Sequence, residues 1–499
     1  MSEPYEGLDR LFNPKSVAVI GASKSFAKTG TAILFSILAG GFRGGIYPIN
    51  PRETEILGLK AYSNLKAVPT KVDLALICVQ AELVPQVVTE CGEAGIGFGI
   101  VISSGFSEIG NGGKDLQKEV LETARAGGMR IIGPNCMGLV STGVSFYALM
   151  NMLIPMAGSA SIVSQSGTIG SLCSVYGSEQ GVGFSKFISS GNEADLRTED
   201  FIEYLASDTQ TTVISAFVEG IQHGKRFIEV AKEATKRKPL IVLKGGITEA
   251  GGQASASHSG SIAGSTDVYD AMVKQTGIVR AENESEMLDL VKAFSLLPLP
   301  KGRNIGVTGA WGGLGVIVSD ACAKRGLVLP QLSRESMEEL DKVLPPFWSH
   351  GNPVDITGAG LGGDFDMLTK PIEILLRDRN IDAVIWMVPA LGSLFERVTL
   401  RMDPHVSKYF SKTALGSLAP QEMELAKRII ELKEKYNKPL VAILIGLYGR
   451  NGAEHIRFLE ENGVPVYETT HQVALVLSKL VDYSEYLEKG IRYCDVSNR

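Results

Sequence analysis

The chain has 499 residues, of which 44% are hydrophobic and 21% are charged, and a formal net charge of −6. This length suggests about three domains. The negative charge argues against a general nucleic-acid partner, which needs a basic surface. No apolar run approaches the length of a membrane span, and the first residues lack the pattern of a signal peptide. The six cysteines form no Cys-x-x-Cys pair, so we expect reduced thiols and a cytoplasmic protein without a membrane partner.

Strands and helices are expected to alternate through the first 145 residues. The expected helices are 31–38, 82–94 and 113–127. Short apolar runs predict strands at 16–20, 45–51, 74–79, 99–103 and 130–133. This alternation implies a parallel sheet that is covered by helices on both faces.

Two further alternating units follow. The second is expected over residues 146–298 and ends in a helical pattern at 284–296. The Pro298-Leu299-Pro300 segment marks its boundary with a third unit at 302–499. The expected strands of these units are 160–164, 213–219, 239–244, 304–309, 383–388, 440–445 and 464–467. The sequence therefore predicts an α/β protein of three doubly wound units, with residues 391–423 as a long loop or lid.

One histidine stands in a loop of small residues between Gly251 and Gly264. The glycines around His258 make backbone movement inexpensive, and a neutral imidazole can act as a nucleophile. A mobile group carrier is one interpretation. An incidental histidine in a solvated linker is the other, and on these residues alone the linker is the better interpretation.

The segment Ser164-Gln165-Ser166-Gly167-Thr168 follows an expected strand and opens an expected helix. Hydroxyl groups, unpaired helix amides and the positive end of the helix dipole favour a phosphate there. Serine is also a favoured helix cap, so an ordinary capping turn is an equal alternative. Glu219, at the end of the expected strand 213–219, could support an imidazole from the ligand-bearing edge of the sheet or could be a surface residue.

The turn Gly21-Ala22-Ser23-Lys24 joins the first expected strand and helix. It matches neither a dinucleotide fingerprint nor a Walker motif, and Asn50-Pro51-Arg52 stands where a ribose-binding carboxylate would be needed. We favour a phosphate-binding turn over a turn that serves packing alone. We do not expect a nicotinamide cofactor. The other five histidines share no metal-ligand spacing, so no metal site is expected.

Taken in order, these motifs resemble the NDP-forming acyl-CoA synthetases of the succinyl-CoA synthetase superfamily, and specifically alpha subunits of ADP-forming acyl-CoA synthetases. The resemblance covers essentially the whole chain. The residues that carry it are 17–23, 47–52, 105–108, 133–138, 164–167, Glu219-Gly220, His258-Ser259-Gly260 and 351–355.

The resemblance implies a Rossmann-like CoA-binding domain followed by two flavodoxin-like domains of the succinyl-CoA synthetase type. It implies that His258 carries a phosphoryl group, that Glu219 supports it, and that an acyl phosphate links acyl-CoA to the phosphohistidine. Phosphate would be bound by Ser164, Gln165, Ser166 and Gly167. CoA would be bound by Gly21, Ala22, Ser23, Lys24, Asn50, Pro51, Arg52, Val79, Ser103, Gly105 and Asn135.

The same resemblance requires a nucleotide site that the sequence does not contain. No ATP-grasp pattern is present, so we expect a separate beta-type subunit that holds ADP or ATP with Mg²⁺, and hence an oligomer. The small substrates would be a carboxylic acid and its acyl-CoA. The alternative is a non-catalytic CoA or acyl-CoA sensor. A dehydrogenase is disfavoured because the dinucleotide fingerprint is absent.

Overall fold

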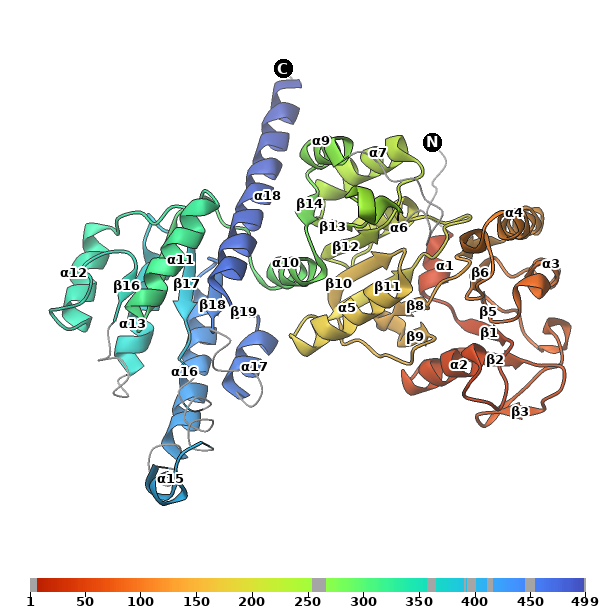
Figure 1. Cartoon of the computed structure of the whole chain (residues 1–499), viewed down its shortest axis with the longest axis horizontal. Coiled ribbons are helices and arrows are strands. Elements are labelled where there is room, and N and C mark those ends of the chain that lie inside the picture. Colours follow the sequence, from red (N-terminus) through yellow and green to blue (C-terminus); the bar gives the residue numbers. More distant parts are fainter. Residues whose placement is uncertain are drawn as a thin grey trace. The chain divides into compact units, whose positions relative to one another are not determined.

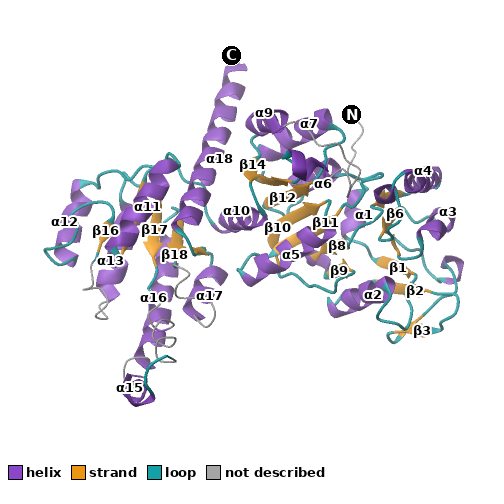
Figure 2. Ribbon diagram, viewed as in Figure 1, coloured by secondary structure: helices purple, strands orange, loops and turns teal. Residues whose placement is uncertain are grey.

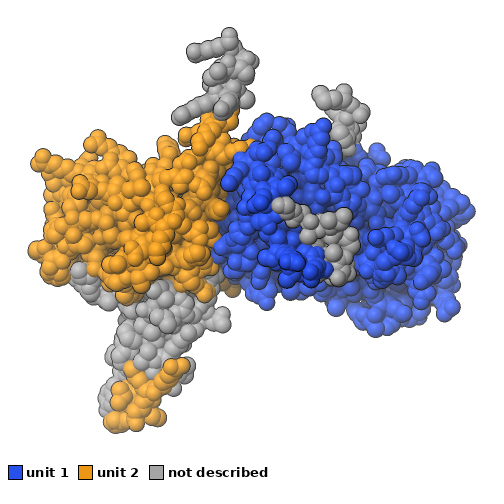
Figure 3. All heavy atoms as spheres, turned by 45° about the horizontal axis from the view of Figure 1, so that its top comes forward, with its two compact units in different colours: residues 1–291 blue, residues 292–499 orange. Residues whose placement is uncertain are grey.

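The computed structural model describes residues 7–253, 266–356, 365–389, 392, 401–410, 416–444 and 454–497. The chain forms two compact units, Met1–Val291 and Lys292–Arg499 (Figure 3). Three main sheets lie within them, two in the first unit and one in the second (Figures 1 and 2). The loop that carries His258 lies outside the described residues, as part of the segment 254–265.

The first sheet is parallel and has the strand order β2-β1-β5-β6-β7. Strands β1, β5 and β6 are buried along their whole length, as expected for a sheet covered on both faces. The strands are β1 (Ser16–Ile20), β2 (Gly45–Ile49), β5 (Leu74–Ile77), β6 (Phe98–Val101) and β7 (Arg130–Ile132). The helices of this region are α1 (Leu8–Phe12), α2 (Thr29–Ala39), α3 (Val84–Glu93) and α4 (Asn111–Ala126). A short hairpin joins β3 (Glu55–Ile56) to β4 (Leu59–Lys60).

The second sheet has seven strands in the order β14-β13-β12-β10-β11-β8-β9. Its strands from β10 to β14 are parallel, whereas β8 and β9 are antiparallel. The strands are β8 (Gly138–Ser141), β9 (Phe146–Leu149), β10 (Ala157–Ser164), β11 (Phe184–Ser189), β12 (Val213–Val218), β13 (Leu240–Lys244) and β14 (Val279–Ala281). The helices are α5 (Gly167–Glu179), α6 (Thr198–Ser207), α7 (Gly224–Thr235) and α9 (Thr266–Thr276).

Strand β8 pairs with the second sheet although it lies inside the predicted first domain, 1–145. The chain therefore passes from one sheet to the other before Gly138. At Gly138 φ is +114°, and a Cβ would lie 1.9 Å from the carbonyl oxygen of Ala148, so only glycine fits this crossing. The predicted domain limits at 145 and 298 remain predictions.

The second unit contains a parallel sheet with the order β16-β15-β17-β18-β19. The strands are β15 (Ile305–Gly309), β16 (Val354–Asp355), β17 (Ala383–Met387), β18 (Leu440–Ile443) and β19 (Val466–Tyr467). The helices are α11 (Gly312–Lys324), α12 (Arg334–Val343), α13 (Phe365–Arg377), α15 (Pro404–Phe410), α16 (Gly416–Lys435), α17 (Glu454–Glu461) and α18 (Thr470–Ser497), with α10 (Glu284–Leu296) leading in from the first unit.

The prediction of a long loop at 391–423 was wrong over much of its length. Helix α15 occupies 404–410, and α16 begins at Gly416. These stretches gave no clear periodicity in the sequence because their polar residues break up the apolar spacing that marks a helix. In the part of the chain that the structure describes, no helix is both long and apolar enough to cross a membrane.

Strand β11 was missed because its sequence, Phe-Ser-Lys-Phe-Ile-Ser, contains polar residues. All six of its residues are nevertheless buried. Lys186 is accommodated by an ion pair with Asp208 at 2.7 Å and by a hydrogen bond to Gln210 at 3.1 Å. A buried, paired lysine of this kind cannot be recognised from local sequence, because its partners lie more than 20 residues away.

Candidate active site

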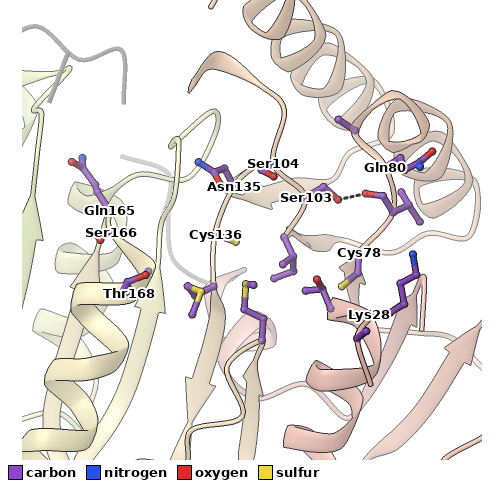
Figure 4. Close-up of a pocket in the computed structure, with 18 residues that line it drawn as sticks. Lys28, Cys78, Gln80, Ser103, Ser104, Asn135, Cys136, Gln165, Ser166 and Thr168 are labelled. Carbon is purple, nitrogen blue, oxygen red and sulfur yellow. Dashed lines mark hydrogen bonds between the residues drawn. The ribbon is translucent and has the colours of Figure 1, made fainter. Parts of the chain in front are cut away.

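A cavity of about 640 Å³ lies in the first unit, where the carboxyl ends of β5 and β6 face the start of α5 (Figure 4). Open parallel sheets bind ligands at this edge. The lining comes from segments far apart in the sequence, namely residues 27–29, 78–81, 102–104, 135–137, 150 and 165–168. The cavity therefore brings part of the predicted CoA set together with part of the predicted phosphate set.

The start of α5 forms one wall of the cavity. Ser166 caps the helix, and its hydroxyl oxygen accepts a hydrogen bond from the amide of Ile169 at 3.4 Å. The amides of Gly167 and Thr168 have no acceptor among the described residues. These donors and the helix dipole favour an anion at this point. Gly167 is required here because a Cβ would lie 1.9 Å from Cγ of Met137.

Ser164, the last residue of β10, does not line the cavity. Its side chain is buried, and its hydroxyl donates to the carbonyl oxygen of Ser166 at 2.5 Å. In this arrangement Ser164 supports the turn into α5. Of the four predicted phosphate residues, Gln165, Ser166 and Gly167 reach the cavity.

The side chain of Gln165 ties the start of α5 to the end of β12. Its Oε1 accepts from the amides of Glu219 and Gly220 at 2.6 and 3.0 Å. Its Nε2 donates to the carbonyl oxygen of Gly220 at 2.8 Å and to Oε2 of Glu193 at 3.0 Å. The amide group is therefore fully engaged by protein atoms, so Gln165 can offer a phosphate little beyond its position at the cavity wall.

Glu219 lies directly after β12 and is half-buried. Its carbonyl oxygen accepts from Nζ of Lys244 at 2.6 Å. Its Cγ is 3.7 Å from the position that a Cβ on Gly245 would occupy. Glu219 thus lies against the beginning of the segment that leads to residues 254–265. The predicted pairing of Glu219 with His258 falls outside the described residues.

Glu193 is a residue of this region that the sequence did not single out. Its side chain is buried, and burial raises its pKa to about 7 despite hydrogen bonds from Thr198, Ser190 and Gln165. In sequence, a glutamate between Asn192 and Ala194 is indistinguishable from a loop carboxylate at the surface. No local signal could have identified it, because its burial and its contact with Gln165, 28 residues away, are set by the tertiary structure.

Three predicted CoA residues, Val79, Ser103 and Asn135, line the cavity. The Ser103 hydroxyl donates to the carbonyl oxygen of Val79 at 2.5 Å. The amide of Asn135 donates to the carbonyl oxygen of Ser103 at 2.9 Å, with φ of +58° at Asn135. These contacts fix the three strand ends as one polar wall. Thr168, from the segment for which the sequence favours a phosphate, also lines the cavity, as do Lys28, Cys78, Gln80, Ser104 and Cys136, which lie outside the predicted CoA set.

The other predicted CoA residues do not line this cavity. Several of them build the turn after β1. At Gly21 φ is +94°, and a Cβ would lie 2.4 Å from the carbonyl oxygen of Cys78. Asn50 Nδ2 donates to the carbonyl oxygen of Ala22 at 2.7 Å, which joins the ends of β1 and β2. The amide of Ser23 donates to the Thr31 hydroxyl at 3.0 Å.

The remaining predicted CoA residues are Lys24, Pro51, Arg52 and Gly105. Lys24 forms an ion pair with Glu53 at 2.9 Å. Arg52, beside the exposed Pro51, has no ion-pair partner among the described residues. The amide of Gly105 donates to Oε1 of Glu108 at 2.6 Å. Of these, Arg52 is the cation that is available to a ligand phosphate.

The polar lining of the cavity is suited to an anion. Burial raises the pKa of Cys136 to about 12 and raises that of Cys78 further, so both thiols are neutral and weak nucleophiles. Among the described residues, no three His, Cys, Asp or Glu side chains are grouped as a metal site requires. The described atoms offer amides, hydroxyls and Lys28, which can hold and orient an anion through hydrogen bonds and charge.

Three family models match the chain in sequence order. They are a CoA binding domain at residues 15–142, a succinyl-CoA ligase like flavodoxin domain at 157–294 and a Ligase-CoA domain at 305–403. The cavity joins the first two of these regions. The combination defines a CoA ligase of the succinyl-CoA synthetase type and confirms the predicted α/β fold class.

Full-length relatives narrow this class. The alpha subunit of ADP-forming acetate–CoA ligase II from Pyrococcus furiosus is 39% identical over 97% of this chain and 99% of its own length. An ADP-forming acetate–CoA ligase from Methanocaldococcus jannaschii is 37% identical over 95% of this chain and 64% of its own length. A Ca. Korarchaeum cryptofilum dinucleotide forming acetyl-coenzyme A synthetase 1, solved with phosphate and ADP, matches with a TM-score of 0.84 and 34% identity over 97% of this chain and 98% of its own.

This chain belongs to the family of NDP-forming acyl-CoA synthetases, in the group of ADP-forming acetate–CoA ligase alpha subunits. The predicted family and the predicted ligase class are confirmed. These relatives give no support to a non-catalytic CoA sensor.

Proposed function

We propose that this chain binds acyl-CoA and phosphate in the cavity of the first unit and carries the resulting phosphoryl group on His258. The observation that supports this most strongly is the cavity itself. It joins the strand ends of the CoA-binding region to the amides at the start of α5. A thioester and a phosphate bound at these two walls would lie close to each other.

The first step would form an acyl phosphate. A phosphate oxygen attacks the thioester carbonyl carbon, the carbon–sulfur bond breaks, and CoA leaves as a thiol after taking up a proton. The free amides of Gly167 and Thr168 and the Ser166 hydroxyl would hold the phosphate and offset its charge. Positioning and charge neutralisation of this kind are the main contributions that a protein makes to phosphoryl transfer.

The second step would move the phosphoryl group to His258. An imidazole nitrogen attacks phosphorus, the bond to the acyl oxygen breaks, and the carboxylate product leaves. Glu219 would hold the other imidazole nitrogen and keep the attacking one neutral. Its contact with the Gly245 region, from which the chain continues toward 254–265, supports this role.

CoA would extend from the cavity along the first sheet. Val79, Ser103 and Asn135 would contact its reactive end. The remaining predicted residues, Gly21, Ala22, Ser23, Lys24, Asn50, Pro51, Arg52 and Gly105, would hold its more distant parts from the outer turns.

The nucleotide step would take place on a partner. An ATP-grasp beta-type subunit would hold ADP and Mg²⁺ and receive the phosphoryl group from His258. Two comparisons support this: the Pyrococcus furiosus relative is named as an alpha subunit, and this chain spans only 64% of the Methanocaldococcus jannaschii enzyme. A hetero-oligomer in the cytoplasm, acting on a small carboxylic acid, completes the proposal.

Labelling of the full chain tests the proposal without the partner. We expect acetyl-CoA and radiolabelled phosphate to give an acid-labile phosphoprotein, and we expect His258→Ala to remain unlabelled. His350→Ala, which replaces an exposed histidine in the second unit, should label as the unaltered chain does. Label that persists in His258→Ala would refute the assignment, and binding of acyl-CoA with no label in any form would favour the sensor.

A separate experiment tests the partner. We expect a chain with an ATP-grasp sequence to co-purify with this chain, and its absence would contradict the proposed hetero-oligomer.

A further inference from the structure

The buried carboxylate of Glu193 lies behind Gln165, which lines the cavity. Through Gln165 it is connected to the start of α5 and to Glu219. We infer that Glu193 is a positioning residue: its ionised carboxylate sets the direction of the Gln165 amide, and that direction holds the Glu219–Gly220 main chain in place for phosphoryl transfer. The inference rests on the function proposed above, because it concerns the same site.

One oxygen of Glu193 is fixed by its own loop and by α6. Oε1 accepts from the Ser190 hydroxyl at 2.8 Å, the Thr198 amide at 3.0 Å and the Thr198 hydroxyl at 2.5 Å. These donors determine how the carboxylate is turned. The second oxygen, Oε2, is left facing Nε2 of Gln165 at 3.0 Å.

The amide of Gln165 can satisfy its neighbours in only one direction. In the observed direction, Oε1 meets the amides of Glu219 and Gly220, and Nε2 meets the carbonyl oxygen of Gly220 and the Glu193 carboxylate. A reversed amide would place its NH₂ against two N–H donors and its oxygen against a carbonyl and a carboxylate. A buried donor that faces another donor, or a buried acceptor that faces another acceptor, loses its hydrogen bond and is strongly disfavoured. An ionised Glu193 therefore selects the observed direction.

Protonation of Glu193 would weaken this selection. A proton on Oε2 turns that oxygen into a donor, which would face the NH₂ of Gln165 and favour the reversed amide. Burial raises the pKa of Glu193 to about 7, and the charge of Glu199 on α6 adds to the rise. The other charged groups near it are Arg197, whose Nε donates to the Glu193 main-chain oxygen at 3.4 Å, and Glu219, which Gln165 links to it. Both protonation states are thus populated near neutral pH.

The test compares phosphorylation of full-length variants by acetyl-CoA and radiolabelled phosphate between pH 6 and 8.5. In Glu193→Gln, we expect the labelling rate to fall about tenfold, which is the effect of losing one buried hydrogen bond. The KM for acetyl-CoA should change less than about twofold. The part of the pH dependence that has a midpoint near 7 should disappear. The matched control is Glu199→Gln, a buried glutamate of the same region that does not touch Gln165; it should keep the rate at pH 8.5 and keep the pH dependence, with its midpoint lowered because the charge of Glu199 adds to the rise in the pKa of Glu193.

A reciprocal exchange provides the rescue. In the double variant Glu193→Gln with Gln165→Glu, an NH₂ from position 193 faces a carboxylate at 165, and that carboxylate still accepts from the amides of Glu219 and Gly220. Three of the four contacts of the Gln165 side chain return, and only the one to the Gly220 carbonyl is lost. Because position 165 lines the cavity, a carboxylate there repels phosphate, so the variants are compared at saturating phosphate, where we expect the double variant to label faster than either single variant. Glu193→Asp, which keeps the charge, should keep the pH dependence.

The outcomes separate the two proposals. If the unaltered chain is not labelled, the proposed function fails. If it is labelled, but Glu193→Gln matches it in rate and pH profile, the positioning role fails. A double variant no faster than the slower single variant, or a Glu193→Asp that loses the pH dependence as Glu193→Gln does, also overturns it.

Discussion

The chain contains the same strand–turn–helix arrangement in both units, with different chemistry at the helix start. In the first unit, β10 leads into α5, and Ser166 caps the helix with its side chain. In the second unit, β15 leads into α11, and Trp311 occupies the cap without a side-chain cap bond. Glycine follows the cap in both cases, at Gly167 and Gly312.

The difference between the two helix starts lies in what surrounds them. At Gly167 the neighbours are Met137 and the Ser189 hydroxyl. At Gly312 a Cβ would lie 2.6 Å from Oδ2 of Asp355, so a carboxylate is beside the first turn. A phosphate at α11 would meet a like charge, whereas at α5 it meets amides and a hydroxyl. A shared topology provides the helix dipole in both places, but side chains from other elements decide whether an anion can bind.

The largest expected effect comes from making the first helix start resemble the second. Thr168→Asp places a carboxylate in the cavity at the second residue of α5. Like charges about 4 Å apart cost about 4 kcal/mol at an effective dielectric constant of 20, so the KM for phosphate should rise at least about a hundredfold. Gly313→Asp makes the same change at the second residue of α11, where nothing lies within 4 Å of an added Cβ. It should leave the KM unchanged, and equal effects of the two variants would contradict the comparison.

The two units also contain buried groups that respond to pH in opposite directions. The pKa of Glu193 is raised from 4.5 to about 7 by burial, so between these values the native state binds more protons than the unfolded state. Its contribution to the free energy of unfolding therefore falls as pH rises through this window, by up to about 3 kcal/mol. Burial lowers the pKa of His455 from 6.5 to about 4, so its contribution falls as pH decreases through that window, by a similar amount.

Thermal unfolding between pH 4.5 and 8 measures both contributions. Relative to the unaltered chain, Glu193→Gln should gain stability as pH rises from 4.5 to 7. Relative to the same chain, His455→Gln should gain stability as pH falls from 6.5 to 4.5. Variants whose stability differences stay constant across pH would show that these groups keep their ordinary pKa values in the native state.

The smallest expected effect separates capping from anion binding. The Ser166 hydroxyl caps α5 at 3.4 Å, and the Ser333 hydroxyl caps α12 at 3.2 Å. Ser166→Ala and Ser333→Ala should each lower the free energy of unfolding by about 1 kcal/mol. Only Ser166→Ala should also weaken phosphate binding, measured as a higher KM for phosphate. A phosphate KM that is unchanged in Ser166→Ala would limit Ser166 to a structural role.

Local sequence patterns located most of the strands and the start of α5, because buried parallel strands read as apolar runs and a helix start after a strand has a recognisable composition. They missed elements that tertiary pairing decides. Strand β8 pairs with the second sheet, and the polar strand β11 is fully buried. Of the predicted CoA residues, Val79, Ser103 and Asn135 line the cavity, and the assignment of the others to CoA stays a prediction. Spacing along the chain does not show which side of a turn faces the ligand.

The sequence by itself determined the family of this protein, through the resemblance of its ordered motifs, and named His258, Glu219 and the Ser164–Gly167 segment as candidate site residues. Only the tertiary structure decided that residues 78–81, 102–104 and 135–137 share one cavity with 165–168, and that Glu193 lies behind Gln165. The physical reason is that hydrogen-bond partners and buried charges are set by contacts between distant segments. Gln165 and Glu219 are 54 residues apart. The sequence around each of them therefore gives no indication that the two form a hydrogen bond.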